Sequence, residues 1–243
     1  MHNRRTLLGA TLAVATALAM TPVASVAQSA WPNKPVRIIV PFPAGGSTDV
    51  IARQLAQRLG NTLGQQFIVE NKAGAGGNIG TDAVAKAAPD GYTIGLSTSG
   101  PLANNKSLYK DMPYDSDKDL TPIALVGEIP LVIVANPQVK ATNLKEFLAL
   151  AKADPKAISV GHPGNGTIGH LALEALKSTA GVEMQSVPYK GDTPAMTDLL
   201  GGSIQAISAP VTAFIPNIQA NKLVALAVTS KKRFPGLQNV PTA

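Results

Sequence analysis

Short apolar runs alternate with amphipathic segments along most of the chain, and Gly or Pro marks nearly every junction. Val36–Val40 is such a run, and residues 48–59 that follow it carry apolar side chains at helical spacing. A strand that leads through a loop and a helix into another strand implies parallel pairing, with the loops gathered at the carboxyl ends of the strands. The sequence therefore predicts an α/β fold.

The same alternation continues to residue 228 and predicts two lobes. We expect further strands at 67–70, 93–97, 131–134, 157–161, 184–188, 204–208 and 223–228, and helices at 79–87, 144–153, 168–179, 194–200 and 211–219. The apolar stretch 123–134 predicts a strand that passes from one lobe into the other. We therefore expect lobe one at 28–128, lobe two at 129–228, and a return of residues 229–243 to lobe one.

The N-terminus has the pattern of a secretory signal peptide. Arg4 and Arg5 precede an apolar run at 7–20, and small residues at Ser25 and Ala27 predict cleavage after Ala27. The run is shorter than the roughly 20 apolar residues of a spanning helix, which disfavours the alternative of a membrane anchor. We therefore expect residues 1–27 to be removed from an exported protein.

Composition excludes several classes of function. The 243 residues contain no Cys, so thiol redox centres and Cys-ligated metals are excluded. Aromatic residues make up only 4%, and no long block of like charge occurs, so we expect no nucleic-acid partner. The net charge of +6 at pH 7 is compatible with attraction of small anions.

The first candidate site is the loop and helix start at 43–49. Gly45 and Gly46 let the backbone approach a ligand, the first N–H groups of the helix favour a carboxylate or phosphate, and Ser47 or Thr48 adds a hydroxyl donor. The alternative is ordinary helix capping by Ser47 and Asp49. The loop alone does not separate the two interpretations.

The second candidate is the glycine-rich loop at 73–80. It misses the dinucleotide pattern G-x-G-x-x-G, because Ile79 stands where the third glycine after Gly74 should fall. The alternative is a permissive turn. We favour a loop that lines an anion cleft, because it repeats the topology of the first loop.

The third candidate does match G-x-G-x-x-G, with Gly164, Gly166 and Gly169 between a strand and a helix. A dinucleotide site is therefore a rival interpretation. It also requires an acidic residue at the end of the next strand, and that strand ends in Tyr189 and Lys190. The rival stays open as an alternative.

Catalytic patterns are scarce. Neither a G-x-S-x-G elbow nor an H-E-x-x-H motif occurs, and His162 and His170 without a third donor make a poor metal site. Lys190 could face an anion and Tyr189 could form the wall beside it, although a solvated Lys and a core-edge Tyr are the simpler interpretation. We expect no enzyme activity, metal or cofactor.

Taken in order, these segments resemble one family. The runs IVPFPAGGSTDVIARQLAQRL, VENKAGAGGNIGTDAVAKAAPDGYT, GHPGNGTIGHLALEAL and VPYKGDTPAMTDLLGG are similar to the Bug (TctC-like) extracytoplasmic solute receptors of tripartite tricarboxylate transporters. The resemblance implies a two-lobe, type II periplasmic-binding-protein-like fold in which each lobe is a mostly parallel sheet flanked by helices and the hinge strands cross. It also implies a monomeric periplasmic receptor that closes on a small carboxylate-bearing solute and serves permease subunits or a sensor.

Carried over to this chain, the resemblance implies a binding site on loops of both lobes. The ligand-binding residues it implies are Phe42, Pro43, Gly45, Gly46, Ser47, Thr48, Asp49, Gly76, Gly77, Asn78, Ser97, Thr98, Ser99, Gly161, His162, Gly164, Gly166, Thr167, Tyr189, Lys190, Gly191, Asp192 and Ser208.

The chain departs from the family pattern in two places. Residues 205–208 read QAIS where many relatives carry an acidic or amide residue, and the sequence ends at Ala243 where relatives continue into elements that complete lobe one. We therefore expect a C-terminally truncated chain. The alternatives are an exported Rossmann-type oxidoreductase that uses 164–169, and an interaction domain whose glycine loops only turn the chain.

Overall fold

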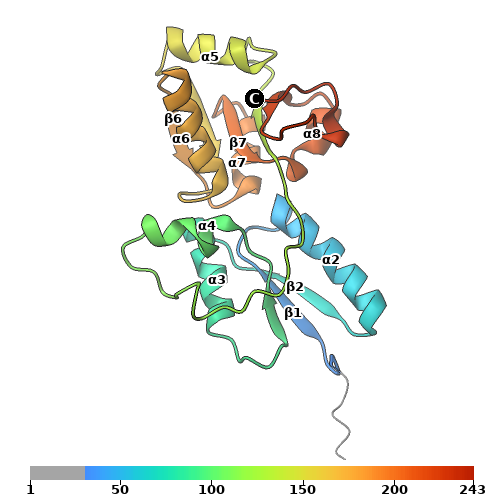
Figure 1. Cartoon of the computed structure of the whole chain (residues 1–243). Coiled ribbons are helices and arrows are strands. Elements are labelled where there is room, and N and C mark those ends of the chain that lie inside the picture. Colours follow the sequence, from blue (N-terminus) through green and yellow to red (C-terminus); the bar gives the residue numbers. More distant parts are fainter. Residues whose placement is uncertain (1–30) are drawn as a thin grey trace, which may run out of the picture. The chain divides into compact units, whose positions relative to one another are not determined.

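The structure is a computed structural model in which residues 31–243 are described (Figure 1). The predicted signal peptide, 1–27, lies outside the described residues. Residues 31–33 belong to a separate N-terminal unit and are irregular, whereas residues 34–243 form one compact unit. None of the helices described in 31–243 is long and apolar enough to cross a membrane.

The first lobe is built on a parallel sheet of order β2-β1-β3, with β1 at Val36–Val40, β2 at Phe67–Asn71 and β3 at Thr93–Gly95. Helix α2 (Ser47–Leu63) covers one face, where Ala52 and Ala56 pack on alternate residues of β1. The helix extends past the predicted end at residue 59 and stops at Gly64, which adopts a left-handed conformation (φ 69°).

The remaining elements of the first lobe are short. The 3-10 turn η1 (Ala75–Gly77) leads into α3 (Asn78–Ala85), which packs on β1 and β3. After β3 the chain forms α4 (Ser99–Leu102) and η2 (Asn104–Ser107). The short helix α4 places η2 near the loops of the second lobe, where Asn104 donates to the carbonyl of Gly166.

The second lobe is built on a mixed sheet of order β6-β5-β7-β4-β8. Its strands are β4 (Leu131–Ala135), β5 (Ser159–His162), β6 (Gln185–Pro188), β7 (Ala206–Pro210) and β8 (Val224–Val228). Strand β5 runs parallel to β6 and β7, whereas β4 is antiparallel to β7 and β8. The α/β prediction is confirmed, with the difference that β4 runs against the parallel part of this sheet.

Both faces of the second sheet are covered because successive residues of each strand point to opposite faces. On one face Ile133 packs with Phe147 and Leu173, in a cluster that includes α5 (Leu144–Ala153) and α6 (Ile168–Ala180). On the other face Val132 packs with Phe214 in a cluster that includes α7 (Asp192–Leu200). The 3-10 turn η3 (Val211–Ala213) and α8 (Ile215–Gln219) close this face.

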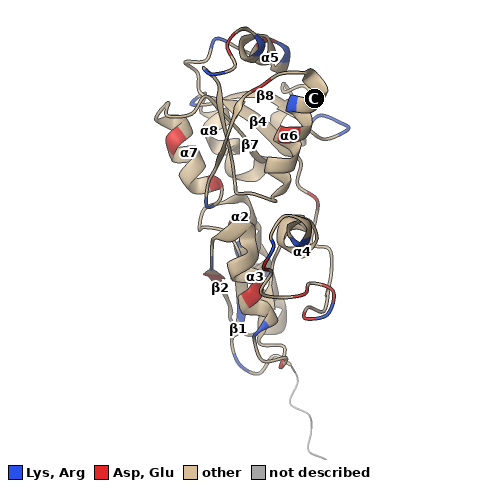
Figure 2. Ribbon diagram, turned by 90° about the vertical axis from the view of Figure 1, so that its left-hand side faces the viewer, with Lys and Arg blue, Asp and Glu red and all other residues tan. Residues whose placement is uncertain are grey.

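Charged side chains are interspersed over both lobes. Figure 2 shows Lys and Arg among Asp and Glu on helices and loops, while most of the strand surface is uncharged. Arg37 and Glu70 on neighbouring strands form one of the exposed ion pairs. The ribbon shows no extended area of one sign.

Two segments differ from the predicted connections between the lobes. Residues 121–130 form no helix or strand, and Ile123 and Leu125 are 80% and 82% exposed, so the predicted strand at 123–134 is limited to β4. Residues 229–243 are expected in lobe one from the sequence. They pack on the second sheet instead, because Leu237 and Val240 enter its core and Val228 bridges to Thr242.

Candidate functional site

The predicted site loops all follow strands at the carboxyl ends of the two sheets, and the loops of the two lobes touch at two places. One contact, which we call the Ser47 seam, joins residues 43–47 to 191–193 and 210–213. The other, which we call the Asn105 seam, joins Gly76 and residues 104–109 to 164–166.

Ser47 is the centre of the first seam. It is fully buried at the start of α2, where its backbone N–H donates to Asp192 Oδ2 (2.8 Å). Its hydroxyl donates to the carbonyl of Pro210 (2.9 Å) and accepts from the N–H of Ala213 (3.1 Å). The residue predicted to receive a solute therefore bonds three groups of the second lobe.

Asp49 serves its own lobe. Its carboxylate accepts hydrogen bonds from Gly45 N (2.9 Å), Asn71 Nδ2 (2.8 Å) and Arg53 Nε (2.9 Å). Burial raises the pKa of Asp49, but the hydrogen bonds from Arg53, Gly45 and Asn71 outweigh burial and leave this pKa below its ordinary value. Asp49 therefore shapes the first loop as an ionised acceptor.

Two amides that no sequence motif marks, Asn104 and Asn105, lie at the second seam. Asn104 Nδ2 donates to the carbonyl of Gly166 (3.4 Å), and the fully buried Asn105 donates through Nδ2 to the carbonyl of Gly76 (3.3 Å). A Cβ at Gly166 would lie only 1.9 Å from Asn105 Oδ1. The glycine loop and Asn105 thus approach each other as closely as a glycine permits.

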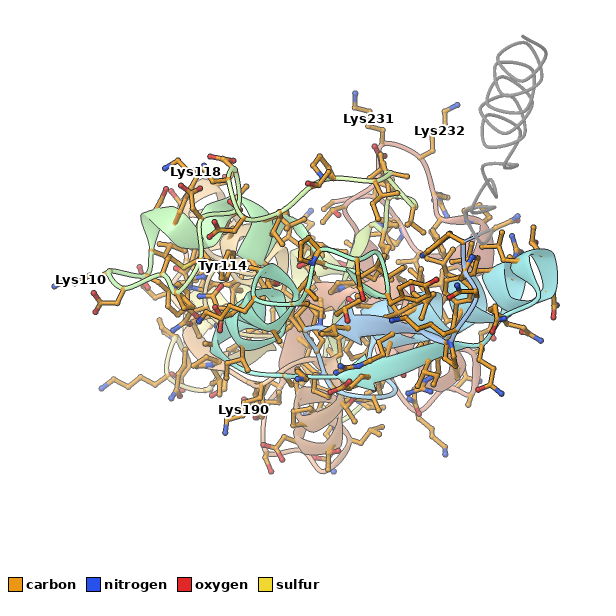
Figure 3. The ribbon with its side chains drawn as sticks, turned by 90° about the horizontal axis from the view of Figure 1, so that it is seen from below. Lys110, Tyr114, Lys118, Lys190, Lys231 and Lys232 are labelled. Atoms are coloured by element: carbon orange, nitrogen blue, oxygen red, sulfur yellow. The ribbon has the colours of Figure 1, made fainter. Side chains whose placement is uncertain are left out.

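A buried polar cluster supports Asn105 from within the first lobe. The side-chain oxygen of Asn78 accepts from Asn105 Nδ2 (2.5 Å) and from Tyr114 OH (3.2 Å), and Tyr114 OH also lies 2.6 Å from the carbonyl of Pro101. Burial raises the pKa of Tyr114 to about 12, so this hydroxyl stays protonated. Tyr114, labelled in Figure 3, is only 6% exposed. Asn78 was predicted as a site residue, whereas Tyr114 was not.

The loop at 163–167 carries the glycine motif and is held by two imidazoles. Gly164 N donates to His162 Nδ1 and Gly166 N donates to His170 Nδ1, each at 3.3 Å. Thr167, the N-cap of α6, donates to the carbonyl of Gly164 (2.6 Å). Burial, with His170 as a second cause, lowers the pKa of His162 to about 4, so the ring is neutral at pH 7.

The geometry of residues 164–169 does not support a dinucleotide-binding site. The motif does lie between β5 and α6, but Gly166 is buried against Asn105. The next strand, β6, ends at Pro188 and is followed by Tyr189 and Lys190, with no acidic side chain at its end.

Two predicted residues direct their polar groups elsewhere. Tyr189 OH donates to Asp198 Oδ2 in its own lobe (2.7 Å), and burial followed by this bond raises the pKa of Tyr189 to about 12. Lys190 is exposed, and Figure 3 shows its side chain extending away from the ribbon. Within residues 31–243 the structure gives Lys190 neither a hydrogen bond nor an ion pair.

Most of the other predicted residues are small or apolar and contact groups of their own lobe. The ring of Phe42 is buried against Gly77, where a Cβ would come within 3.2 Å of Cζ. The Ser97 hydroxyl pairs with Thr81 (3.1 Å), and the carbonyl of Ser208 is so close to α6 that only Gly169 fits there. Of the remaining predicted residues, Gly161 and Thr48 are buried, Thr98 is half-buried and Ser99 is exposed.

Surface hollows lie apart from this region. One of about 690 Å³ runs between α2 and β2, and one of about 480 Å³ lies beside Asn136 and Ile204. Neither hollow is lined by a predicted site residue. Converging polar groups therefore identify the candidate site better than the size of a hollow does.

The chemistry that the seams offer is hydrogen bonding. Backbone N–H groups, amides and hydroxyls gather there, as in sites that hold a carboxylate without an ion pair. In the described part of the chain, no group of three His, Asp or Glu side chains is placed to hold a metal ion. The arrangement fits binding of a small polar molecule.

Comparison with known proteins identifies the family of the chain. Residues 51–243 match the family described as "Tripartite tricarboxylate transporter family receptor". Protein BugT of Bordetella pertussis is 42% identical over 243 residues, which is all of this chain and 74% of that protein.

Solved structures give the same result. The R. palustris protein Rpa4515 with adipate superimposes with a TM-score of 0.85 at 36% identity, over 87% of this chain and 71% of that one. MatC from Rhodopseudomonas palustris with bound malate superimposes with a TM-score of 0.81 at 32% identity, over 88% of this chain and 72% of that one. The resemblance noted in the sequence is confirmed, and with it a solute-binding receptor role.

Proposed function

Because the chain belongs to the receptor family of tripartite tricarboxylate transporters, we propose that it captures a small carboxylate-bearing solute between its two lobes in the periplasm and delivers it to the permease of such a transporter. Membership of the family shows a solute-binding receptor. The solute class, the compartment and the permease partner are our proposal.

The observation that carries the proposal is the meeting of uncharged donor loops from both lobes. The loop that leads into α2 and the loop at 163–167 are both glycine-rich and both meet the opposite lobe, and the buried amide of Asn105 lies against Gly166. A carboxylate can be held by several such donors without a Lys or Arg. The carboxylates in the two R. palustris structures, adipate and malate, support the same class of solute.

The binding residues that we propose are a subset of those predicted from the sequence, and most of them are buried. In lobe one, expected at 28–128, they are Phe42, Gly76, Gly77, Ser97 and Thr98, and in lobe two, expected at 129–228, they are Gly161, Gly164, Gly166, Thr167 and Ser208. Asp49, Tyr189 and Lys190 are left out, because their polar groups are engaged within one lobe or point to solvent.

A thermal-shift screen tests this function. The probes are malate, adipate, citrate, aspartate, benzoate and NAD, each added to the chain without residues 1–27. A ligand at 100 times its dissociation constant stabilises the folded state by about 2.7 kcal/mol, which raises Tm by several degrees for a chain of this size. We expect one carboxylate class to raise Tm. A shift with NAD alone would instead support the oxidoreductase alternative.

A further inference from the structure

Asp192 places a carboxylate of the second lobe at the start of a helix of the first. It is the first residue of α7, is 6% exposed, and its Oδ2 accepts the backbone N–H of Ser47 at 2.8 Å. Ser47 begins α2, which is 17 residues long. The N-terminus of such a helix favours an anion, because its first N–H groups lack intrahelical partners and its dipole is positive there. The anion present at this position is a side chain of the protein.

The residues beside Asp192 fit tightly against the first loop. Gly191 has φ +120°, and a Cβ there would lie 2.2 Å from Pro43 Cδ. A Cβ at Gly46 would lie 3.5 Å from Asp192 Oδ2, and the hydroxyl of Thr193 donates to the carbonyl of Ala44 (2.9 Å). This contact therefore has a defined geometry that depends on the lobes being together.

Burying this carboxylate is costly unless the contact compensates for it. Burial raises the pKa of Asp192, and the hydrogen bonding from Ser47 opposes that rise. Among the described ion pairs, none involves Asp192. The carboxylate is therefore held by the helix start of the opposite lobe, and separating the lobes would return it to water.

We propose that Asp192 is a positioning residue that latches the lobes together: its carboxylate occupies the anion position of α2, favours the closed arrangement without solute, and keeps the solute's carboxylate away from Ser47. Only the last clause rests on the proposed function. The latch itself needs no solute, so its test and the test of carboxylate binding can fail separately.

The latch can be tested by measuring the distance between the lobes in solution. The chain has no Cys, so Gln57→Cys on α2 and Lys152→Cys on α5, both at exposed positions, accept spin labels cleanly. Double electron–electron resonance is then recorded without added solute. In this background, Asp192→Ala is compared with Asp154→Asn, which removes an exposed carboxylate of the same lobe.

We expect Asp192→Ala to increase the population at longer distances about tenfold, since a charge-assisted hydrogen bond is lost. Asp192→Asn retains an acceptor for Ser47 N and is expected to open less. Asp154→Asn is expected to match the background. Equal distance distributions in Asp192→Ala and the background would overturn the latch.

A second pair of variants decides the matter if Asp192→Ala does not fold. Ser47→Pro removes the N–H that Asp192 accepts, and proline suits the first position of a helix. Ser47→Ala loses the same hydroxyl but keeps that N–H. A longer distance in Ser47→Pro than in Ser47→Ala supports the latch, and equal distances in the two variants would overturn it.

Discussion

The imidazole rings of His162 and His170 lie 4.6 Å apart between centroids, and each accepts a backbone N–H of the glycine loop between them. An imidazole accepts through Nδ1 only when that nitrogen carries no proton. Protonation of His162 would therefore replace an acceptor with a donor beside the loop that contacts the first lobe.

This arrangement predicts that stability falls in mild acid. The pKa of His162 is lowered from 6.5 to about 4 in the folded state, so the unfolded chain binds the proton more tightly. The stability contribution is complete above the unfolded pKa and is lost as pH falls from about 6.5 to about 4. Once the pH has fallen below about 4, the free energy of unfolding is lower by roughly 3 kcal/mol than at neutral pH.

Urea unfolding between pH 4 and 7 measures this effect against His162→Asn, which keeps an acceptor but does not titrate. The free energy of unfolding of the parent chain should fall more steeply with acid than that of the variant. Parallel pH profiles for the two chains would show that His162 does not carry the dependence.

Gly166→Ala is expected to destabilise the chain more than Gly181→Ala. Both glycines have left-handed backbones, at φ +82° and +61°, so alanine costs roughly 1 kcal/mol of strain at either position. At Gly181 a Cβ meets nothing within 4 Å, whereas at Gly166 it meets Asn105 Oδ1 at 1.9 Å. Chemical denaturation compares the two variants. Equal losses would mean that the Asn105 seam is not closed in solution.

Tyr114→Phe is expected to cost about 1–3 kcal/mol, because it leaves the buried carbonyl of Pro101 without its donor, while Asn78 keeps the bond from Asn105. Tyr109→Phe is the matched control. Its hydroxyl donates to Asn165 at the exposed edge of the seam (3.1 Å), so water can replace it and the loss should stay below about 1 kcal/mol. The reverse order of the two losses in urea unfolding would contradict the cluster around Asn105.

Asp49 and Arg53 should contribute unequally although they form one ion pair. Asp49→Asn weakens an acceptor that is 3% exposed and also serves Gly45 and Asn71, and we expect a loss of about 2 kcal/mol. Arg53 is 55% exposed, so Arg53→Ala should cost less than about 1 kcal/mol.

The pKa of Asp49 is lower in the folded chain than in the unfolded chain. It therefore adds stability at pH values above the unfolded pKa, and this stability is lost as pH falls through the folded pKa. Thermal melts at pH 7 and pH 3 measure both effects.

The sequence predicted the regular elements well because their signals are local. The helix expected at 144–153 is α5 at Leu144–Ala153, and the strand expected from Val36 to Val40 is β1. Apolar spacing and Gly or Pro at the ends determine such elements within a few residues. The prediction of a strand at 123–134 was wrong for residues 123–130. Apolar residues alone do not form a strand, because a strand also requires a neighbouring strand to pair with.

The sequence predicted the loops of the candidate site, but it did not predict the residues that contact those loops. The glycines and Ser47 could be found from their positions between strands and helices. Asn105 and Tyr114 lie in segments without a motif, and only tertiary contact places them beside Asn78. Asp192 was selected as a ligand contact, but its role at Ser47 depends on a pairing 145 residues apart that no local pattern encodes.

The central claim, that the two lobes hold a carboxylate, is tested most directly by isothermal titration calorimetry. The chain without residues 1–27 is titrated with malate, adipate, citrate and aspartate, and then with the dimethyl esters of malate and adipate as uncharged controls of similar shape. We predict binding of one acid per chain, with loss of binding when its carboxylates are esterified. Esters that bind as tightly as the acids, or a folded chain that binds NAD and none of the acids, would contradict the account.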